Sequence, residues 1–192
     1  MKRIALVLLA IVALVTACVP SLYPFYTDKD VVTDVRLVGT WRTDNGNDND
    51  AEGETWKFEA STNKTYTATI IEAKEKIGHF ECHLFKIRQD LFIDMTPSEI
   101  KLATDQADII GASIIPGHLL FRVKFEGQKL KIAGCNFSWI EQYIKKHPSA
   151  IRCRLYNDSI CITDETIALQ KFVSKHLNEG EMFNNWENYK RL

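Results

Sequence analysis

Apolar and polar residues alternate along much of the chain between Leu37 and Gly134. From Leu119 to Phe125, for example, every second residue is a large apolar one, and the residues between them include an arginine and a lysine. A period of two is typical of strands that bury one face and expose the other. The pattern predicts about nine short strands, near residues 37–43, 54–60, 64–73, 77–88, 90–95, 118–126, 128–134, 150–155 and 159–163. Short strands joined by tight turns favour a closed antiparallel barrel or a sandwich, so we expect a mainly β fold.

Helical spacing replaces this alternation in two places. After a capping Ser138, apolar residues recur every three or four positions until Pro148 ends the segment. A second helix is predicted to begin after Thr163 or Asp164 and to end before Gly180. We expect both helices to be accessory elements that lie across the wall or the mouth of a barrel. The stretch 97–117 has no clean period and is predicted to be a long connection that could cover one end of the barrel.

The first eighteen residues follow a different pattern. Lys2 and Arg3 precede an apolar run over residues 4–15, and the motif VTAC then ends at Cys18. The run is shorter than the roughly 20 residues that cross a bilayer, and small residues before a cleavage point are typical of export signals. The terminal cysteine makes this segment similar to the signal peptide and lipobox of bacterial lipoproteins.

This resemblance implies that residues 1–17 are removed and that Cys18 becomes an acylated N-terminus, with the membrane as a partner through the lipid anchor. The expected organisation is a signal peptide (1–17), a lipidated cysteine with a tether (18–36) and a single domain (37–192). Val19 is not the aspartate that retains many lipoproteins in the inner membrane. We therefore expect a location in the cell envelope, at the outer membrane and facing the periplasm if the host has one.

The composition is that of a folded globular chain. The 24 basic and 25 acidic residues nearly balance, and 45% of the residues are hydrophobic. Because no block of Lys or Arg stands out, nucleic acid is not an expected partner. The length after the signal peptide suits one domain with a sizeable core.

The motif Gly39-Thr40-Trp41 opens the first predicted strand. A G-x-W motif at this place resembles lipocalins and related calycins, and it implies an up-and-down barrel whose tryptophan plugs the closed end. The chain lacks a T-D-Y motif and places a helix before its last strands. The stretch 21–41 is also similar to the mature start of uncharacterised bacterial lipoproteins, a resemblance that implies envelope location and fold but no activity. The expected fold is thus a lipocalin-like barrel of eight or nine strands with two accessory α-helices.

A barrel of this size can hold one small apolar ligand. The candidate ligand-binding residues are the aromatic side chains expected to point inward, Trp41, Trp56, Phe58, Tyr66, Phe121 and Phe125. The alternative is a filled barrel that acts as a structural or protein-interaction lipoprotein, for example a hydrolase inhibitor or an envelope-assembly factor. Both functions are non-enzymatic.

Two groups of residues resemble metal sites. Asp48, Asp50, Glu52, Gly53 and Glu59 nearly match the spacing of a calcium-binding EF-hand loop, but the end of this stretch is predicted to be a strand, so a solvated hairpin loop is favoured. On the strand near 77–88, side chains at alternate positions share one face, which places His79, Glu81 and His83 together. A polar outer barrel face is the favoured interpretation, and we expect neither a metal nor a cofactor.

Catalytic signatures are weak. Ser98, Ser113 and Ser159 lie in no nucleophile elbow of the G-x-S-x-G type. Metal chemistry aside, a serine or cysteine nucleophile would need a base and an orienting acid near it. The sequence therefore predicts that the protein is not an enzyme.

Cys82, Cys135, Cys153 and Cys161 allow several disulfide pairings in an oxidising envelope. Cys153 and Cys161 flank a predicted hairpin tip. They face each other if the loop holds three residues and miss register if it holds two. The sequence leaves the pairing open.

Overall fold

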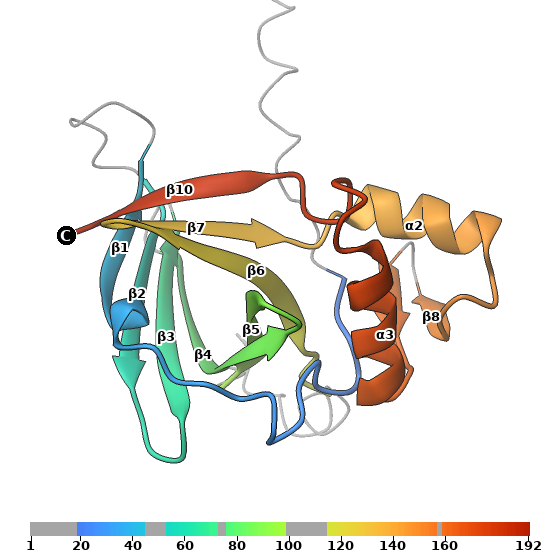
Figure 1. Ribbon diagram of the computed structural model, residues 1–192, viewed down its shortest axis with the longest axis horizontal. Coiled ribbons are helices and arrows are strands. Elements are labelled where there is room, and N and C mark those ends of the chain that lie inside the picture. The colour runs from blue at the N-terminus through green and yellow to red at the C-terminus, as the bar shows by residue number, and fades with distance from the viewer. Residues whose placement is uncertain (1–18, 45–52, 73–75, 99–114, 157–158) are drawn as a thin grey trace, which may run out of the picture.

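The computed structural model describes residues 19–44, 53–72, 76–98, 115–156 and 159–192. Eight antiparallel strands close into a barrel with the order β1-β10-β7-β6-β5-β4-β3-β2 (Figure 1). Their bounds are β1 Gly39–Thr43, β2 Thr55–Ala60, β3 Thr65–Glu72, β4 Lys76–Ile87, β5 Asp90–Pro97, β6 Leu119–Glu126, β7 Lys129–Gly134 and β10 Trp186–Arg191. This architecture confirms the predicted mainly β fold with an antiparallel barrel.

The chain between β7 and β10 forms a group of elements outside the barrel, at the right of Figure 1. It contains α2 (Phe137–Lys146), β8 (Cys153–Tyr156), β9 (Ser159–Ile162) and α3 (Thr166–His176). The two predicted accessory helices are therefore present. Their predicted caps were wrong: the N-cap of α2 is Asn136, whose side chain accepts the Trp139 N–H, and that of α3 is Glu165, which makes no capping side-chain hydrogen bond. The strands predicted near 150–155 and 159–163 are also present, but they form a separate two-stranded sheet and take no part in the barrel.

The eighth barrel strand, β10, was missed by the sequence pattern. Its inward positions are Glu187, Tyr189 and Arg191, and only Tyr189 is buried. Because the other two inward positions are charged, the strand has no stripe of apolar residues that alternation could reveal. Its place is set by its two neighbours, since Thr43 and Leu130 both pair with Tyr189.

The barrel has an apolar core on each side of its wall. The interior core contains Leu37, Trp41, Trp56, Phe58, Tyr66, Cys82, Leu84, Ile93, Met95, Val123, Leu130 and Tyr189, among others. A second core lies between the outer face of β4 to β7 and the helices. It includes Phe85, Phe92, Leu120, Ala133, Ile140, Ile144, Leu169, Phe172 and Phe183. Both faces of the central strands are thus buried, which explains the run of buried residues from Phe92 to Met95.

One end of the barrel is closed by the 3-10 helix η1 (Val35–Leu37). The Trp41 indole donates to the carbonyl oxygen of Leu37 (2.9 Å), and the Arg191 guanidinium lies 4.5 Å over the Trp41 ring. Gly39 has a φ of +137°, and a Cβ there would lie 2.7 Å from Arg191 Nη1. Glycine is therefore required at this place of the G-x-W motif for two reasons: other residues rarely adopt this φ, and their side chain would collide with Arg191.

At the opposite end, which we call the open end, β1, β3, β5 and β7 finish and β2, β4, β6 and β10 begin. The segment 19–38 runs along the outer wall from the open end to the closed end. Ser21 pairs with His118 just before β6, and farther along Val32 donates its backbone N–H to the carbonyl oxygen of Leu84 (2.8 Å). Backbone hydrogen bonds thus join this segment to the barrel wall near both of its ends.

The register of the β8–β9 hairpin determines how Cys153 and Cys161 lie relative to each other. Tyr156 pairs with Ser159, so the loop holds two residues. Cys153 pairs with Ile162, whereas Cys161 pairs with Arg154. Because paired residues share a face and neighbours along a strand alternate, the two thiols lie on opposite faces, and both are free.

Among the helices of the described segments, none has the length and apolar character that a membrane crossing requires.

Candidate functional site

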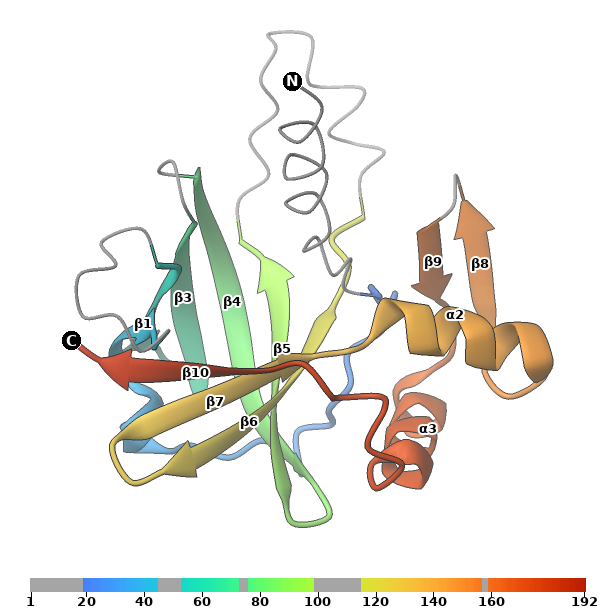
Figure 2. The same ribbon diagram turned by 90° about the horizontal axis from the view of Figure 1, so that it is seen from above.

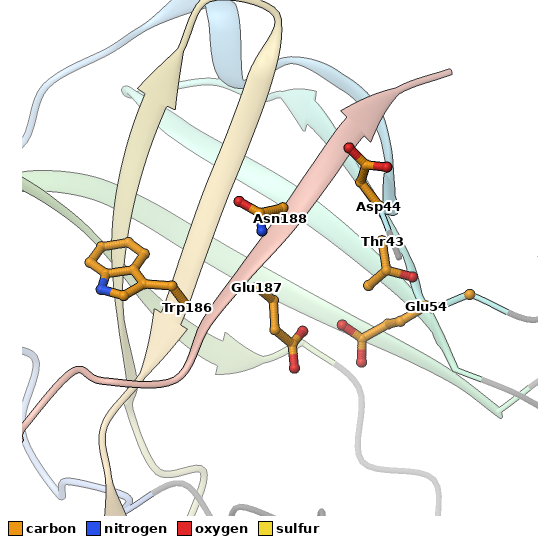
Figure 3. A pocket seen from close by; sticks show the side chains of 7 residues that line it. Thr43, Asp44, Glu54, Trp186, Glu187 and Asn188 are labelled. Carbon is orange, nitrogen blue, oxygen red and sulfur yellow. The ribbon is translucent and has the colours of Figure 1, made fainter. Parts of the chain in front are cut away.

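A polar hollow of about 390 Å³ lies at the open end, between the end of β1 and the start of β10. Figure 3 shows the side chains around it. Its lining residues are Thr43, Asp44, Gly53, Glu54, Trp186, Glu187 and Asn188. Polar oxygen atoms dominate this set, so the hollow suits a ligand that donates hydrogen bonds or carries positive charge.

The side chains of Glu54 and Glu187 point toward each other in this hollow (Figure 3). The Tyr189 hydroxyl lies 2.8 Å from Glu54 Oε1 and 2.8 Å from Glu187 Oε2. The Trp56 indole also donates to Glu54 Oε1. Burial raises the pKa of Tyr189, and the negative charges of Glu54 and Glu187 raise it further. The phenol therefore stays protonated and serves as a donor between two acceptors.

The hydrogen-bond capacity of the two carboxylates exceeds what these partners supply. A phenol has a single hydrogen, yet oxygens of Glu54 and Glu187 both lie within hydrogen-bond distance of it. When both carboxylates are ionised they repel each other, and the one phenol hydrogen cannot satisfy both. An additional donor or a cation between them would therefore be favourable.

The backbone around the hollow is tightly constrained. Thr43 Oγ1 is buried and has no hydrogen-bond partner among the described residues. A Cβ at Gly53 would lie only 2.5 Å from this oxygen. Glycine therefore lets the chain pass close to β1 just before Glu54.

A second hollow of about 230 Å³ lies at the same end, inside the hairpin of β3 and β4. Its lining is mixed, with Ile70, Ile77 and Phe80 beside Glu72 and Lys76. The open end thus offers a polar hollow and a partly apolar one.

The six aromatic residues predicted to bind a ligand all belong to the barrel interior. Trp56 is their centre, with ring centroids 5.8 Å from Phe58, 5.3 Å from Phe121 and 6.0 Å from Tyr189. Toward the closed end, Arg36 lies 4.5 Å over the Phe125 ring. Trp56, Phe58 and Phe121 thus pack against one another together with Tyr189, and we call this group the aromatic floor.

Sequence reasoning missed the residues that line the polar hollow. Glu187 lies on the strand without an apolar stripe, and Glu54 precedes the first clear alternation of β2. The available signal was the period of two itself, because Glu54 is two positions before Trp56 and Glu187 is two before Tyr189. Each glutamate therefore shares the inward face with a buried aromatic residue.

His79, Glu81 and His83 share the outer face of β4, as the alternation predicts, but the two histidines have different neighbours. His79 and His83 occupy alternate positions on β4, where His79 lies 3.3 Å from Thr69 Oγ1 and His83 stacks on Tyr26 with ring centroids 4.3 Å apart. In the part of the chain that the structure describes, no three His, Cys, Asp or Glu side chains are grouped to hold a metal ion.

The stretch that resembles a calcium-binding loop is described only in part. Asp48, Asp50 and Glu52 lie outside the described residues. Glu59 is exposed on β2 and forms an ion pair with Lys57 (3.0 Å). Glu54, in contrast, contributes to the polar hollow.

One buried acid and histidine pair lies on the outer wall. Asp94 Oδ1 is 2.7 Å from His118 Nδ1, and Asp94 Oδ2 accepts the backbone N–H of Phe25 (2.8 Å). The Thr96 hydroxyl lies 3.2 Å from the same Nδ1. A catalytic triad places the acid and the nucleophile on different nitrogens of the imidazole, whereas Asp94 and Thr96 both contact Nδ1. The Asp94 carboxylate holds the N-terminal segment through Phe25.

Of the three serines considered as nucleophiles, the structure describes the side chain of one. Ser98 is exposed after β5, Ser113 lies outside the described residues, and so does the side chain of Ser159.

Comparison with known proteins found no matching family model, no matching curated protein and no matching solved structure.

Proposed function

We propose that this protein is a lipid-anchored lipoprotein of the cell envelope that binds a small amphipathic ligand at the open end of its barrel, without catalysis. The observation that carries the proposal is the closed barrel with a polar hollow above an aromatic floor. The lipobox that ends at Cys18 supports the anchor. The outer membrane, facing the periplasm, is the proposed location if the host has one.

The chemistry of the open end specifies the ligand further. Glu54 and Glu187 accept hydrogen bonds, so the ligand's polar group carries an amine or several hydroxyls. Its apolar part contacts Ile70 and Phe80 in the neighbouring hollow or displaces the upper aromatics of the floor. No nucleic acid, metal or cofactor enters this proposal.

Native mass spectrometry of the full-length protein, extracted from envelopes in a mild detergent, tests the proposal. We expect an additional mass of a few hundred daltons that disappears on denaturation. The double substitution Glu54→Gln with Glu187→Gln should reduce occupancy at least about tenfold, because a charge-assisted hydrogen bond is worth roughly 1.5–3 kcal/mol.

Glu59→Gln is the matched control. It removes one carboxylate charge from β2, the strand that follows Glu54, but Glu59 lies on the outer face and is exposed. Binding that is lost equally in the control, or that survives in the double variant, would contradict a role for the two carboxylates.

The filled-barrel alternative has its own support, since the interior aromatics contact one another. In that case the barrel serves as a scaffold, and its surface contacts another envelope protein as an inhibitor or assembly factor. Protein that stays bare after incubation with fatty acids, phospholipids and amphipathic amines would favour this alternative.

A further inference from the structure

The domain begins directly after the proposed anchor. Val19 is only 2% exposed and belongs to the outer core. In the sequence, Cys18 is bonded directly to this buried residue, with no linker residue between them. A lipid attached to Cys18 would therefore hold the domain at the bilayer surface without a flexible linker.

The attachment point lies at the open end of the barrel. Ser21 pairs with His118, which immediately precedes β6, and β6 begins at the open end. Ser21 also runs parallel to Ile162 at the end of β9, so the β8–β9 hairpin extends from there in the direction of residue 19 and beyond. Figure 2 shows the start of the described chain, the open end and the end of β8 on the same side of the molecule.

Exposed apolar side chains gather on this same side. Ile71 and Ile77 pair at the tip of the β3–β4 hairpin and are 37% and 57% exposed. Ile115, before β6, is 69% exposed, and Leu155, near the tip of the β8–β9 hairpin, is 70% exposed. We call these four residues the open-end rim. Isolated exposed apolar residues are common, but these four occupy the side from which the anchor would emerge.

We propose that the open-end rim lies against the lipid bilayer, so that the mouth of the barrel faces the membrane. The proposal rests on the acylation of Cys18 that the proposed function includes. Apolar side chains of an anchored protein gain from transfer into the interfacial region. Since the hollow lined by Glu54 and Glu187 opens at this end, its ligand passes between bilayer and barrel and comes from the membrane lipids.

Site-directed labelling of the acylated full-length protein tests this orientation. The protein is reconstituted in vesicles of phosphatidylethanolamine and phosphatidylglycerol, with Cys153→Ser and Cys161→Ser as background. A fluorescent label is attached through Ile77→Cys at the rim or through Val35→Cys at the closed end, where Val35 is 83% exposed. Doxyl-labelled lipids should quench the rim label several-fold more strongly than the closed-end label.

Equal quenching at the two positions would overturn the proposal. So would a rim label that is shielded from both doxyl lipids and aqueous acrylamide, because a second protein copy would then cover the rim. The intact mass of the N-terminal peptide separates the two proposals. A peptide without acyl chains contradicts the anchor, whereas an acylated protein with a water-exposed rim contradicts the orientation alone.

A linker variant tests the role of the short connection. Twelve Gly and Ser residues inserted between Cys18 and Val19 would span about 20 Å on average and would leave the lipobox intact. Quenching of the rim label should then fall toward that of the closed-end label. Unchanged quenching in the acylated linker variant would overturn the inference that the short connection orients the barrel.

Discussion

At the scale of single residues, the outer wall holds a stacked pair of aromatic rings whose pKa values are shifted in opposite directions by burial. Tyr26 lies on His83 with ring centroids 4.3 Å apart. Burial raises the pKa of Tyr26 to about 12, and the charge of Asp94 adds to this effect. Burial lowers the pKa of His83, although the nearby carboxylates of Glu81 and Asp94 oppose this shift. The folded state therefore favours neutral forms of both rings.

The lowered pKa of His83 predicts that the stability of the protein depends on pH. Because the pKa of His83 is lower in the folded than in the unfolded protein, the unfolded chain binds a proton first as the pH falls below about 6.5. The free energy of unfolding should then decrease from neutral pH toward pH 5. Urea unfolding at several pH values measures the slope.

His83→Gln is the variant to compare. It should show a shallower loss of stability between about pH 6.5 and 5 than the natural chain. His79→Gln, on the same face of β4 but exposed, is the control and should keep the natural slope. An identical slope in all three proteins would assign the pH dependence to other groups.

At the scale of elements, the N-terminal segment behaves as an additional strap on the barrel wall. Asp94 accepts the Phe25 N–H, and Gln170 on α3 donates to the carbonyl oxygen of Phe25 (3.0 Å). Gln170 also donates to Asp30 Oδ2 (2.8 Å). Burial opposes ionisation of Asp30, but hydrogen bonds from Thr27 and Gln170 outweigh it and lower the pKa of that carboxyl. The strap thus links the barrel to the helices.

Asp94→Ala should loosen the strap. The substitution leaves the buried N–H of Phe25 without its acceptor and should cost roughly 1–3 kcal/mol. Hydrogen exchange measured by mass spectrometry should quicken first in residues 21–32, before the barrel strands respond. Asp28→Ala, at an exposed position of the same segment, should change the exchange rate neither of residues 21–32 nor of the barrel strands. Equally faster exchange over the whole barrel in the Asp94 variant would contradict the inference that Asp94 acts on the strap alone.

At the scale of the whole molecule, the two cores share a wall. Phe92 on β5 points outward, with ring centroids 5.7 Å from both Phe85 and Phe183. Its strand neighbour Ile93 belongs to the interior core. A substitution that alters packing in one core should therefore also affect the other core, because adjacent residues of one strand belong to both.

Phe92→Ala should destabilise the entire protein, although the side chain lies outside the barrel. A buried Phe→Ala change typically costs about 3–5 kcal/mol. We expect one cooperative urea transition, shifted to lower denaturant and detected alike by circular dichroism and tryptophan fluorescence. Val35→Ala, at an exposed position, should leave the midpoint in place, and two separate transitions in the Phe92 variant would show that the helices unfold independently.

The sequence by itself determined the local elements. Strands β1 to β7 follow from the alternation of apolar and polar residues, and the two helices follow from the spacing of their apolar residues. The inward direction of Trp41, Trp56 and Phe121 follows from the same alternation. These properties depend on near neighbours along the chain, which a single sequence displays.

Only the tertiary structure decided which elements close the barrel and what its open end contains. β10 has no apolar stripe and is recognised by pairing with β1 and β7, while β8 and β9 look like barrel strands yet pair only with each other. Glu54 and Glu187 come from distant parts of the sequence and meet at one phenol. Such contacts arise from the closure of the sheet and the register across it, which are set by long-range packing and leave no periodic trace in the chain.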